Sequence, residues 1–437
     1  MKRMKEIGIG LLGFGTVGAG VVKGLRENGN LIAHRLGVKP VLRRIADLDL
    51  DSDRGVQVDR TLLTTDAKGV IDSPEIDVVV ELIGGTGVAR ELIKRALARG
   101  KPVVTANKAL LAEHGAELFG LARRKKTDLY FGASVGGGIP IIRALREGLI
   151  ANRIESIYGI LNGTCNYILT RMETAALPFD QALSEAQSQG FAEANPGLDI
   201  DGFDTAHKAV ILASLAYGFH IPMSAVHIEG IRGLSDTDIR YALDLGYRIK
   251  LLAVIRHHDS AKGSAVDVRV HPALVPLSHV LASVGGVFNA VMVRGDYSGD
   301  TLYYGRGAGR LPTAGTVIAD ICDVVRNLAS GSCGRVPAMA DSGERVRLMP
   351  VREIRTRYYL RLLLRDKPGV LASFAAVLGR HGISIASVLQ KESNAGEFVP
   401  AVILTHKACE KDLDAALRET DTMDFAGSKT VRLRIEE

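Results

Sequence analysis

The stretch IGIGLLGFGTVG, residues 7–18, decides the fold at the start of this 437-residue chain. An apolar run, Ile7 to Leu12, is followed at once by three spaced glycines and then by the helix-like AGVVKGLREN. Gly13 permits a tight turn, Gly15 lets a pyrophosphate approach bare backbone, and Gly18 lets the helix pack closely on the strand. Because the glycines have a strand before them and a helix after them, the motif predicts dinucleotide binding.

The sequence beyond this motif alternates between strands and helices. Further strands are predicted at residues 41–46, 78–83 and 102–105, and a helix is predicted at 88–99. This alternation predicts an α/β domain with a Rossmann-like, doubly wound parallel sheet.

The end of the second predicted strand bears on the choice of cofactor. An acid here, Asp47, would hold a ribose hydroxyl of NAD, whereas Arg43 or Arg44 would accommodate the 2'-phosphate of NADP. The two arginines favour NADP, and the alternative is a solvated strand end.

Composition excludes several classes of protein. Apolar residues make up 46% and charged residues 24%, as in a folded protein of two or three domains. With a net charge of +6, 5% aromatics and no Trp, nucleic-acid binding is not expected. The four cysteines form no CxxC pair, which argues against a zinc site or disulfides and favours the cytoplasm. The longest apolar helical stretch, residues 209–219, is shorter than the ~20 residues that span a bilayer, so no membrane segment is expected.

Two segments in the middle of the chain combine glycines with small polar residues. The loop FGASVGGGIPII, residues 131–142, exposes backbone and either turns sharply or binds something, such as a monovalent cation on carbonyl oxygens. The segment LNGTCN, residues 161–166, could offer a hydroxyl, an amide and backbone to a zwitterion, or be an ordinary polar loop. Its Cys165 is either a nucleophile or a small buried hydrophobe.

Charged residues that could perform catalysis gather in two places. Lys108 follows an apolar strand, so it lies at the carboxyl edge of the sheet, where open α/β folds bind ligands. Asp204 begins a helix on which Lys208 lies one turn later, so that the carboxylate can hold the ammonium group. Glu193 and Asp199 on the preceding loop could bind a substrate amine, and a surface salt bridge is the alternative.

These segments together resemble the homoserine dehydrogenase family over the whole chain. The longest match is AQSQGFAEANPGLDIDGFDTAHK, residues 186–208. VVELIGG, TANKALLA, SVGGGIPII, LNGTCNYIL and YYGRGAGRLPTAG also look like segments of that family and occur in the same order.

The resemblance implies a role for each matching position. Contacts to the cofactor are implied for residues of the glycine turn, the strand ends and a second glycine loop, namely Gly13, Phe14, Gly15, Thr16, Val17, Gly18, Lys108, Gly307 and Gly309. Lys208 would donate and accept the proton, with Lys108 as a second lysine at the reacting oxygen and Asp204 positioning Lys208. Glu193 and Asp199 would bind homoserine, and Gly163 and Thr164 would line its pocket.

The resemblance also implies a monovalent cation, Na⁺ or K⁺. Its ligands would be main-chain oxygens of Gly132, Val135, Gly137 and Ile139. Members of the family often carry Glu where this chain has Gly132. Because the ligand is a carbonyl oxygen, we expect the site to survive with a weaker or different ion preference.

The pattern changes from about Arg357. A predicted strand at 358–365 is followed by a helix, strands at 383–389 and 398–404, a second helix and a last strand at 430–435. This ferredoxin-like βαββαβ order resembles an ACT domain, which implies an amino-acid effector, with threonine as the natural candidate and dimerisation as the alternative role. We therefore expect a nucleotide domain (1–140), an α+β catalytic and dimerisation domain (141–335) whose last part returns to the first, a linker (336–356) and the ACT domain (357–437).

The resemblance implies NAD(P)-dependent interconversion of L-aspartate 4-semialdehyde and L-homoserine, in the biosynthesis of threonine, methionine and isoleucine, by a homodimer or homotetramer. As hydride reaches the aldehyde carbon, a preorganised ammonium group would stabilise the charge on oxygen and then supply the proton. One rival is a semialdehyde dehydrogenase that forms a thioester at Cys165. The other is an amino-acid sensor without catalysis.

Overall fold

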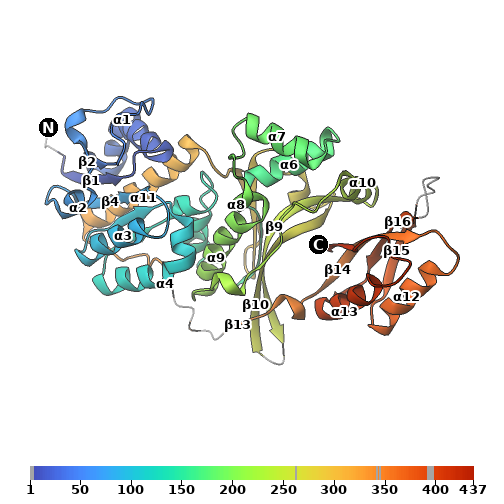
Figure 1. Ribbon diagram of the computed structural model, residues 1–437. Helices are drawn as coiled ribbons and strands as arrows, with labels where there is room; N and C mark the ends of the chain where they lie inside the picture. Colours follow the sequence, from blue (N-terminus) through green and yellow to red (C-terminus); the bar gives the residue numbers. More distant parts are fainter. Residues whose placement is uncertain (1–3, 261–262, 341–342, 344–345, 391–397) are drawn as a thin grey trace. The chain divides into compact units, whose positions relative to one another are not determined.

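The computed structural model describes residues 4–260, 263–340, 343, 346–390 and 398–437 (Figure 1). The chain folds into two compact units, each built from three segments. Unit 1 consists of the chain up to Leu161, Ala206–Ser224 and Phe288–Arg345, and unit 2 consists of Asn162–Thr205, Ala225–Val287 and Val346–Glu437. Within the described residues, every helix is too short or too polar to cross a membrane.

Unit 1 contains a parallel sheet with the strand order β3-β2-β1-β4-β5-β6. Its strands are β1 (Glu6–Leu12), β2 (Lys39–Ala46), β3 (Leu63–Thr64), β4 (Val78–Glu81), β5 (Val103–Thr105) and β6 (Leu129–Tyr130). This order confirms the predicted Rossmann-like sheet. The winding reverses between β1 and β4, and ligands of such folds bind where the strands end at this point.

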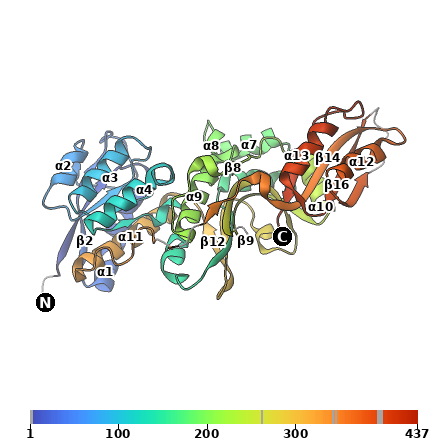
Figure 2. The same ribbon diagram turned by 90° about the horizontal axis from the view of Figure 1, so that it is seen from below.

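Helices cover both faces of this sheet. They are α1 (Thr16–Leu36), α2 (Ala67–Asp72), α3 (Val88–Ala98), α4 (Lys108–Lys125) and α11 (Arg310–Ser330). Figure 2 shows α1 and α11 side by side on one face and α2, α3 and α4 on the other. Helix α11 thus returns from far along the chain to complete the nucleotide-binding fold.

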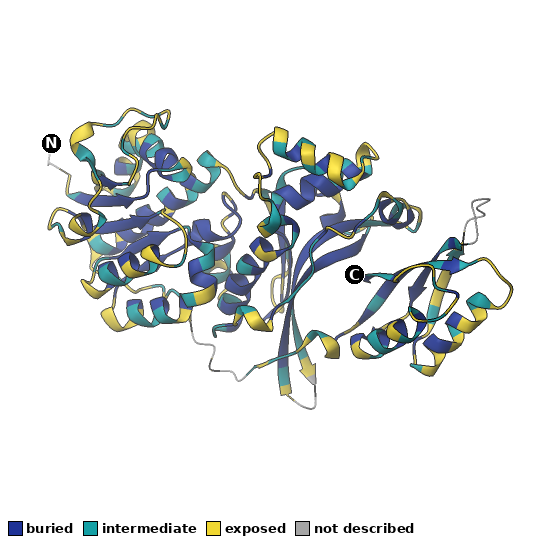
Figure 3. Ribbon diagram, viewed as in Figure 1, coloured by how far each residue is buried: buried dark blue, intermediate teal, exposed yellow. Residues whose placement is uncertain are grey.

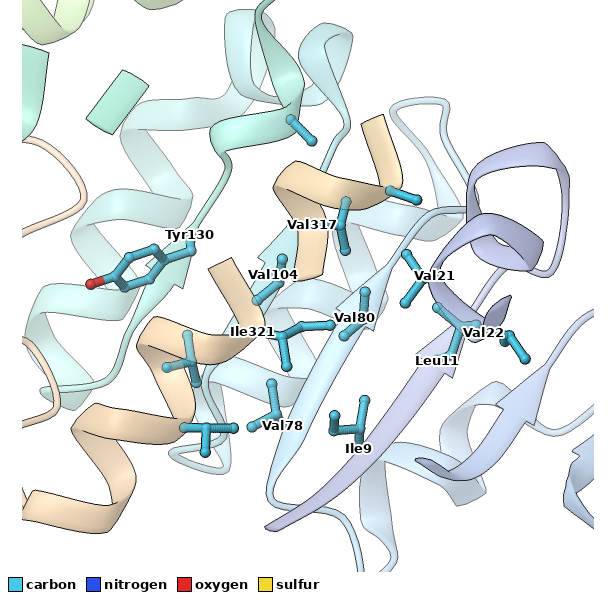
Figure 4. Packing of buried hydrophobic residues seen from close by; sticks show 14 of the residues in the cluster. Ile9, Leu11, Val21, Val22, Val78, Val80, Val104, Tyr130, Val317 and Ile321 are labelled. Atoms are coloured by element: carbon cyan, nitrogen blue, oxygen red, sulfur yellow. The ribbon is translucent and has the colours of Figure 1, made fainter. Parts of the chain in front are cut away.

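The core of unit 1 explains why the central strands β1, β4 and β5 are almost continuously apolar. Strand side chains such as Ile9, Val80 and Val104 point toward Val317 and Ile321 of α11 (Figure 4). All of these side chains are buried. Strands covered on both faces have no solvated side on which polar residues could alternate.

Unit 1 also contains a three-stranded antiparallel arrangement. Strand β11 (Phe288–Gly295) pairs with β7 (Ile154–Ile160) on one side and with β12 (Gly299–Arg306) on the other. The short helix α5 (Ile141–Arg143) follows the glycine loop that precedes β7.

Unit 2 is built on the long antiparallel pair β9 (Tyr247–Ser260) and β10 (Gly263–Pro276). The short strands β8 (His227–Ile228) and β13 (Arg347–Leu348) pair with β10. Its helices are α6 (Gly163–Thr174), α7 (Phe179–Ser188), α8 (Gly197–Ile200) and α10 (Asp236–Asp244). Helix α9 (Phe203–Tyr217) contributes residues to both units.

The carboxyl-terminal part of unit 2 has the predicted βαββαβ order. It comprises β14 (Arg355–Arg365), α12 (Val370–Arg380), β15 (Ile385–Gln390), β16 (Phe398–Thr405), the short β17 (Ala408–Cys409), α13 (Glu410–Thr420) and β18 (Val431–Ile435). Figure 3 shows that α12 and α13 expose one side and bury the other. Strand β18 pairs with β14 and also with β10, so Arg434 lies opposite both Tyr358 and Ala273. One sheet therefore runs from the ACT fold into the long hairpin.

Candidate active site

The glycine turn after β1 has the geometry that the sequence predicts. Gly13 has a φ of +98°, and a Cβ there would lie 2.6 Å from the carbonyl of Leu82. A Cβ on Gly18 would lie 2.2 Å from the oxygen of Gly13, so neither position tolerates a side chain. Gly15 precedes the first turn of α1, which has no side-chain cap, and a Cβ there would meet nothing within 4 Å. The open backbone and uncapped N–H groups suit a pyrophosphate.

A cavity of about 590 Å³ adjoins this turn. Its lining includes Gly13, Gly15, Asp47, Arg54 and Lys68. The Asp47 carboxylate accepts hydrogen bonds from the amide of Phe14 (2.5 Å) and from that of Asp49 (3.0 Å). Asp47 therefore holds the glycine turn in place.

Arg43 and Arg44, which the sequence predicts at the cofactor, have partners of their own in the structure. Arg43 pairs with Glu6 at 2.6 Å, and Arg44 donates to the carbonyl of Thr61 at 2.7 Å. Both residues precede the carboxyl end of β2, and neither is among the described residues that line the cavity. The basic side chains that line the cavity are Arg54, in the loop after β2, and Lys68, on α2. The sequence does not single them out, because no local pattern shows that these two charges face the glycine turn.

Lys108 is the first residue of α4, directly after β5. The Asn107 side chain caps the helix by accepting from the amide of Leu110 (3.1 Å) and donates to the carbonyl of Gly85 (2.7 Å). The Thr105 hydroxyl accepts from the amide of Asn107 (3.0 Å) and donates to the buried carboxylate of Glu81 (2.6 Å). These bonds fix the start of α4, and with it the backbone of Lys108, at the carboxyl edge of the sheet.

The two glycine loops of unit 1 pack against each other. Gly137 has a φ of +52°, and a Cβ there would lie 2.6 Å from the carbonyl of Gly307. A Cβ on Gly307 would lie 1.3 Å from Oδ1 of Asn289, whose Nδ2 donates to the carbonyl of Ile160 (2.6 Å). Gly309, with a φ of +116°, precedes α11. Glycine is therefore required at both contact positions.

The predicted cation loop lies above a buried carboxylate of α11. The amide of Gly132 donates to Asp320 at 2.7 Å, and burial raises the pKa of Asp320 to about 6. The hydroxyl of Thr316 donates to the carbonyl of Gly137 at 2.7 Å, and Val135 and Ile139 are buried. Among the described residues, no group of three or more His, Cys, Asp or Glu side chains could hold a metal ion.

Lys208 is a buried lysine, 8% exposed, on α9. Its amine donates to the carbonyl of Leu161 at 2.6 Å, directly after β7. Asp204, 7% exposed, lies one helical turn earlier. Buried charges are costly unless they are paired and hydrogen-bonded, so this arrangement is typical of a functional site.

The remaining predicted substrate residues lie in unit 2 around Asn162. Its amide nitrogen donates to Asp199 (2.7 Å) and to Asp204 (2.9 Å), and its oxygen caps α6. The hydroxyl of Thr164 donates to the carbonyl of Phe191 (2.6 Å) and lies 3.3 Å from Asp199. Three of the predicted side chains, with Asn162, thus form one polar cluster.

Three further predicted positions differ in their surroundings. A Cβ on Gly163 would lie 2.9 Å from the carbonyl of Val287, so this position accepts only glycine without a shift. Glu193 lies on an exposed loop. Cys165 is fully buried and its thiol donates to the carbonyl of Asp199 at 3.2 Å, which agrees with a small buried residue.

Comparisons with known proteins agree with this arrangement. The family model "Homoserine dehydrogenase, NAD binding domain" matches residues 13–132, "Homoserine dehydrogenase" matches 140–322, and "ACT domain" matches 358–422. The homoserine dehydrogenase of Neisseria gonorrhoeae is 45% identical over 437 residues, which cover 99% of both chains. That of Pseudomonas aeruginosa is 44% identical over 440 residues, 99% of this chain and all of the other.

The crystal structure of a homoserine dehydrogenase from Thiobacillus denitrificans has a TM-score of 0.93 at 45% identity and covers all of both chains. The fold and site, taken with these matches, define an NAD(P)-dependent oxidoreductase. Within that class, the chain belongs to the homoserine dehydrogenase family.

Proposed function

We propose that this protein interconverts L-aspartate 4-semialdehyde and L-homoserine, the step of threonine, methionine and isoleucine biosynthesis that the family name implies. The observation that carries the proposal is the amine of Lys208, which is buried and held at 2.6 Å by the carbonyl of Leu161. A lysine that only formed a surface salt bridge would be exposed to solvent and not buried in this way.

The nicotinamide cofactor, when bound, supplies or accepts the hydride. Lys208 stabilises the negative charge that develops on the aldehyde oxygen and gives that oxygen a proton, and it takes the proton back in the oxidation direction. Asp204 positions Lys208, and Lys108 at the carboxyl edge of the sheet is the second lysine at the reacting oxygen. Glu193 and Asp199 bind the ammonium group of the substrate, and Gly163 and Thr164 line the pocket.

We further propose NADP as the preferred cofactor, with Arg54 and Lys68 rather than Arg43 or Arg44 at its 2'-phosphate. One observation supports this: both residues line the cavity beside the glycine turn, where their positive charges could meet a phosphate. The Arg54→Ala variant should raise the KM for NADP at least about tenfold and change that for NAD little. A selective loss in Arg43→Ala or Arg44→Ala instead would restore the assignment made from the sequence.

The central experiment is a steady-state assay of homoserine oxidation with NAD and with NADP. We expect Lys208→Met to lower kcat by about 10²- to 10⁴-fold, while the exposed Lys125→Met serves as the matched control. If Lys108→Met and Lys208→Met combined left turnover near that of the unmodified protein, the proposal would be refuted. Absence of turnover with either cofactor would favour the non-catalytic sensor.

Regulation, the cation, the assembly and the compartment complete the proposal. The ACT fold supports an amino-acid effector, which we propose to be threonine, so threonine should lower turnover in the same assay; dimerisation alone is the competing role.

A monovalent cation, Na⁺ or K⁺, would bind main-chain oxygens of the loop 132–139, and replacing both ions with tetramethylammonium should reduce activity. We propose a homodimer or homotetramer in the cytoplasm, which sedimentation of the purified protein tests.

A further inference from the structure

We propose that Asn162 is a positioning residue that holds the two carboxylates of the site, Asp199 and Asp204, with a single side-chain amide. The sequence suggested that an amide in this segment would face the substrate. The contacts assign it a different role, and the inference rests on the proposed function of the site.

All the donor capacity of the Asn162 side chain is used within the cluster. A primary amide has two N–H donors, and Nδ2 donates to Oδ1 of Asp199 at 2.7 Å and to Oδ2 of Asp204 at 2.9 Å. Its Oδ1 accepts from the amide of Cys165 at 2.8 Å, which caps α6. The side chain is 4% exposed, so it is fixed at both ends and has no donor left for a substrate.

Two carboxylates that share one partner repel each other, and burial makes an unsatisfied carboxylate expensive. An asparagine meets this requirement because it offers two hydrogens without adding charge. Serine, threonine and aspartate can cap a helix equally well, but none can donate to two carboxylates at once. The presence of asparagine at this cap is therefore explained by the carboxylates and not by the helix alone.

The two carboxylates lie in different surroundings. Asp199 has further support, since Thr164 lies 3.3 Å from its other oxygen and Cys165 donates to its carbonyl at 3.2 Å. Asp204 lies at the start of α9, one turn before Lys208. Because Thr164 and Cys165 also hold Asp199, loss of the amide should change substrate binding little, whereas displacement of Asp204 should impair proton transfer by Lys208.

The decisive variants are Asn162→Ser and Asn162→Ala. Serine keeps a capping oxygen and can donate to one carboxylate at most, whereas alanine removes the cap and both donors. We expect kcat to fall by about 10- to 100-fold in both variants with a change in homoserine KM below about threefold. The thermal midpoint should fall clearly only in Asn162→Ala. If Asn162→Ser kept kcat within about threefold, the role would be capping alone and the inference would be overturned.

A double-mutant cycle tests whether the effect passes through Asp204. Asn162→Ser should cost little further kcat in an Asp204→Asn background, because the carboxylate it positions is already gone. Independent, multiplying losses would contradict the inference. A crystal structure of Asn162→Ser gives a readout that does not depend on turnover, since the Asp204 carboxylate should leave its position. Unchanged positions of both carboxylates would overturn the inference, whereas lack of homoserine turnover by the unmodified protein would overturn only the proposed function.

Discussion

Replacement of Arg434 by methionine should destabilise unit 2 more than any substitution on its surface. Arg434 is fully buried in β18, where its guanidinium donates to Glu410 at 3.0 Å and to Glu229 at 2.9 Å. Burial alone would raise the pKa of both carboxyls. Hydrogen bonds and the charge of Arg434, with His227 for Glu229, nevertheless hold both pKa values below the usual 4.5.

The magnitude follows from which charges remain after the change. Removing one partner of a buried ion pair costs about 3–5 kcal/mol, because the other charge stays buried without compensation. Here Arg432 lies 3.0 Å from Glu410 and 3.2 Å from Glu229, so part of the compensation survives. We therefore expect a loss near the lower end, about 3 kcal/mol.

Urea unfolding of Arg434→Met, of Glu410→Gln and of the double variant measures this loss. The double variant should recover much of the stability, because no buried carboxylate is then left at position 410. Folding lowers the pKa values of both carboxyls, so the ion pair stabilises the fold above about pH 4.5, and this contribution is lost as the pH falls. The difference in free energy of unfolding between wild type and Arg434→Met should therefore become smaller in acid. Equal stability of Arg434→Met and wild type at pH 7 would refute the reasoning.

Three further predictions concern single side chains. Burial lowers the pKa of Lys250 to about 8, so its charged form opposes folding below that pH. Between pH 8 and 10, the free energy of unfolding of the wild type, measured in urea, should rise by on the order of 2 kcal/mol relative to that of Lys250→Met. A difference that stays constant with pH would contradict this. Gly307→Ala should lose activity and about 1–3 kcal/mol of stability, because its Cβ would lie 1.3 Å from Asn289, whereas Gly315→Ala, with open space around the new Cβ, should fold and work normally. Cys165→Ser should keep most homoserine oxidation, since its buried thiol donates to a carbonyl; an inactive but folded variant would favour the thioester mechanism.

Local sequence patterns predicted the elements of this fold well. The strand, glycine turn and helix from Ile7 onward, and the βαββαβ order from Arg357, depend on periodicity and turn residues that lie within a few positions of each other. The position of Lys208 on a helix, one turn after Asp204, was also predictable, because Asp204 and the apolar residues after it mark a helix.

Contacts between distant segments were not predictable in this way. Asn162 bonds residues 37 and 42 positions away, and no local pattern distinguishes that use of an amide from a simple helix cap. The partners of Arg43 and Arg44, which are Glu6 and the carbonyl of Thr61, were likewise not predictable from the sequence around them. Pairing among charged side chains depends on tertiary neighbours, which the sequence alone does not give.

The position of β18 between β10 and β14 has a consequence for attempts to remove the ACT domain. A chain that ends before β14 would lack β18 as well, and the stretch of β10 that pairs with β18, at Ala273 and Leu274, would become open. Uncovered strand edges are templates for association with other chains. Truncation is therefore expected to give a protein that aggregates, and a deregulated enzyme is better sought through point substitutions in the effector-binding fold.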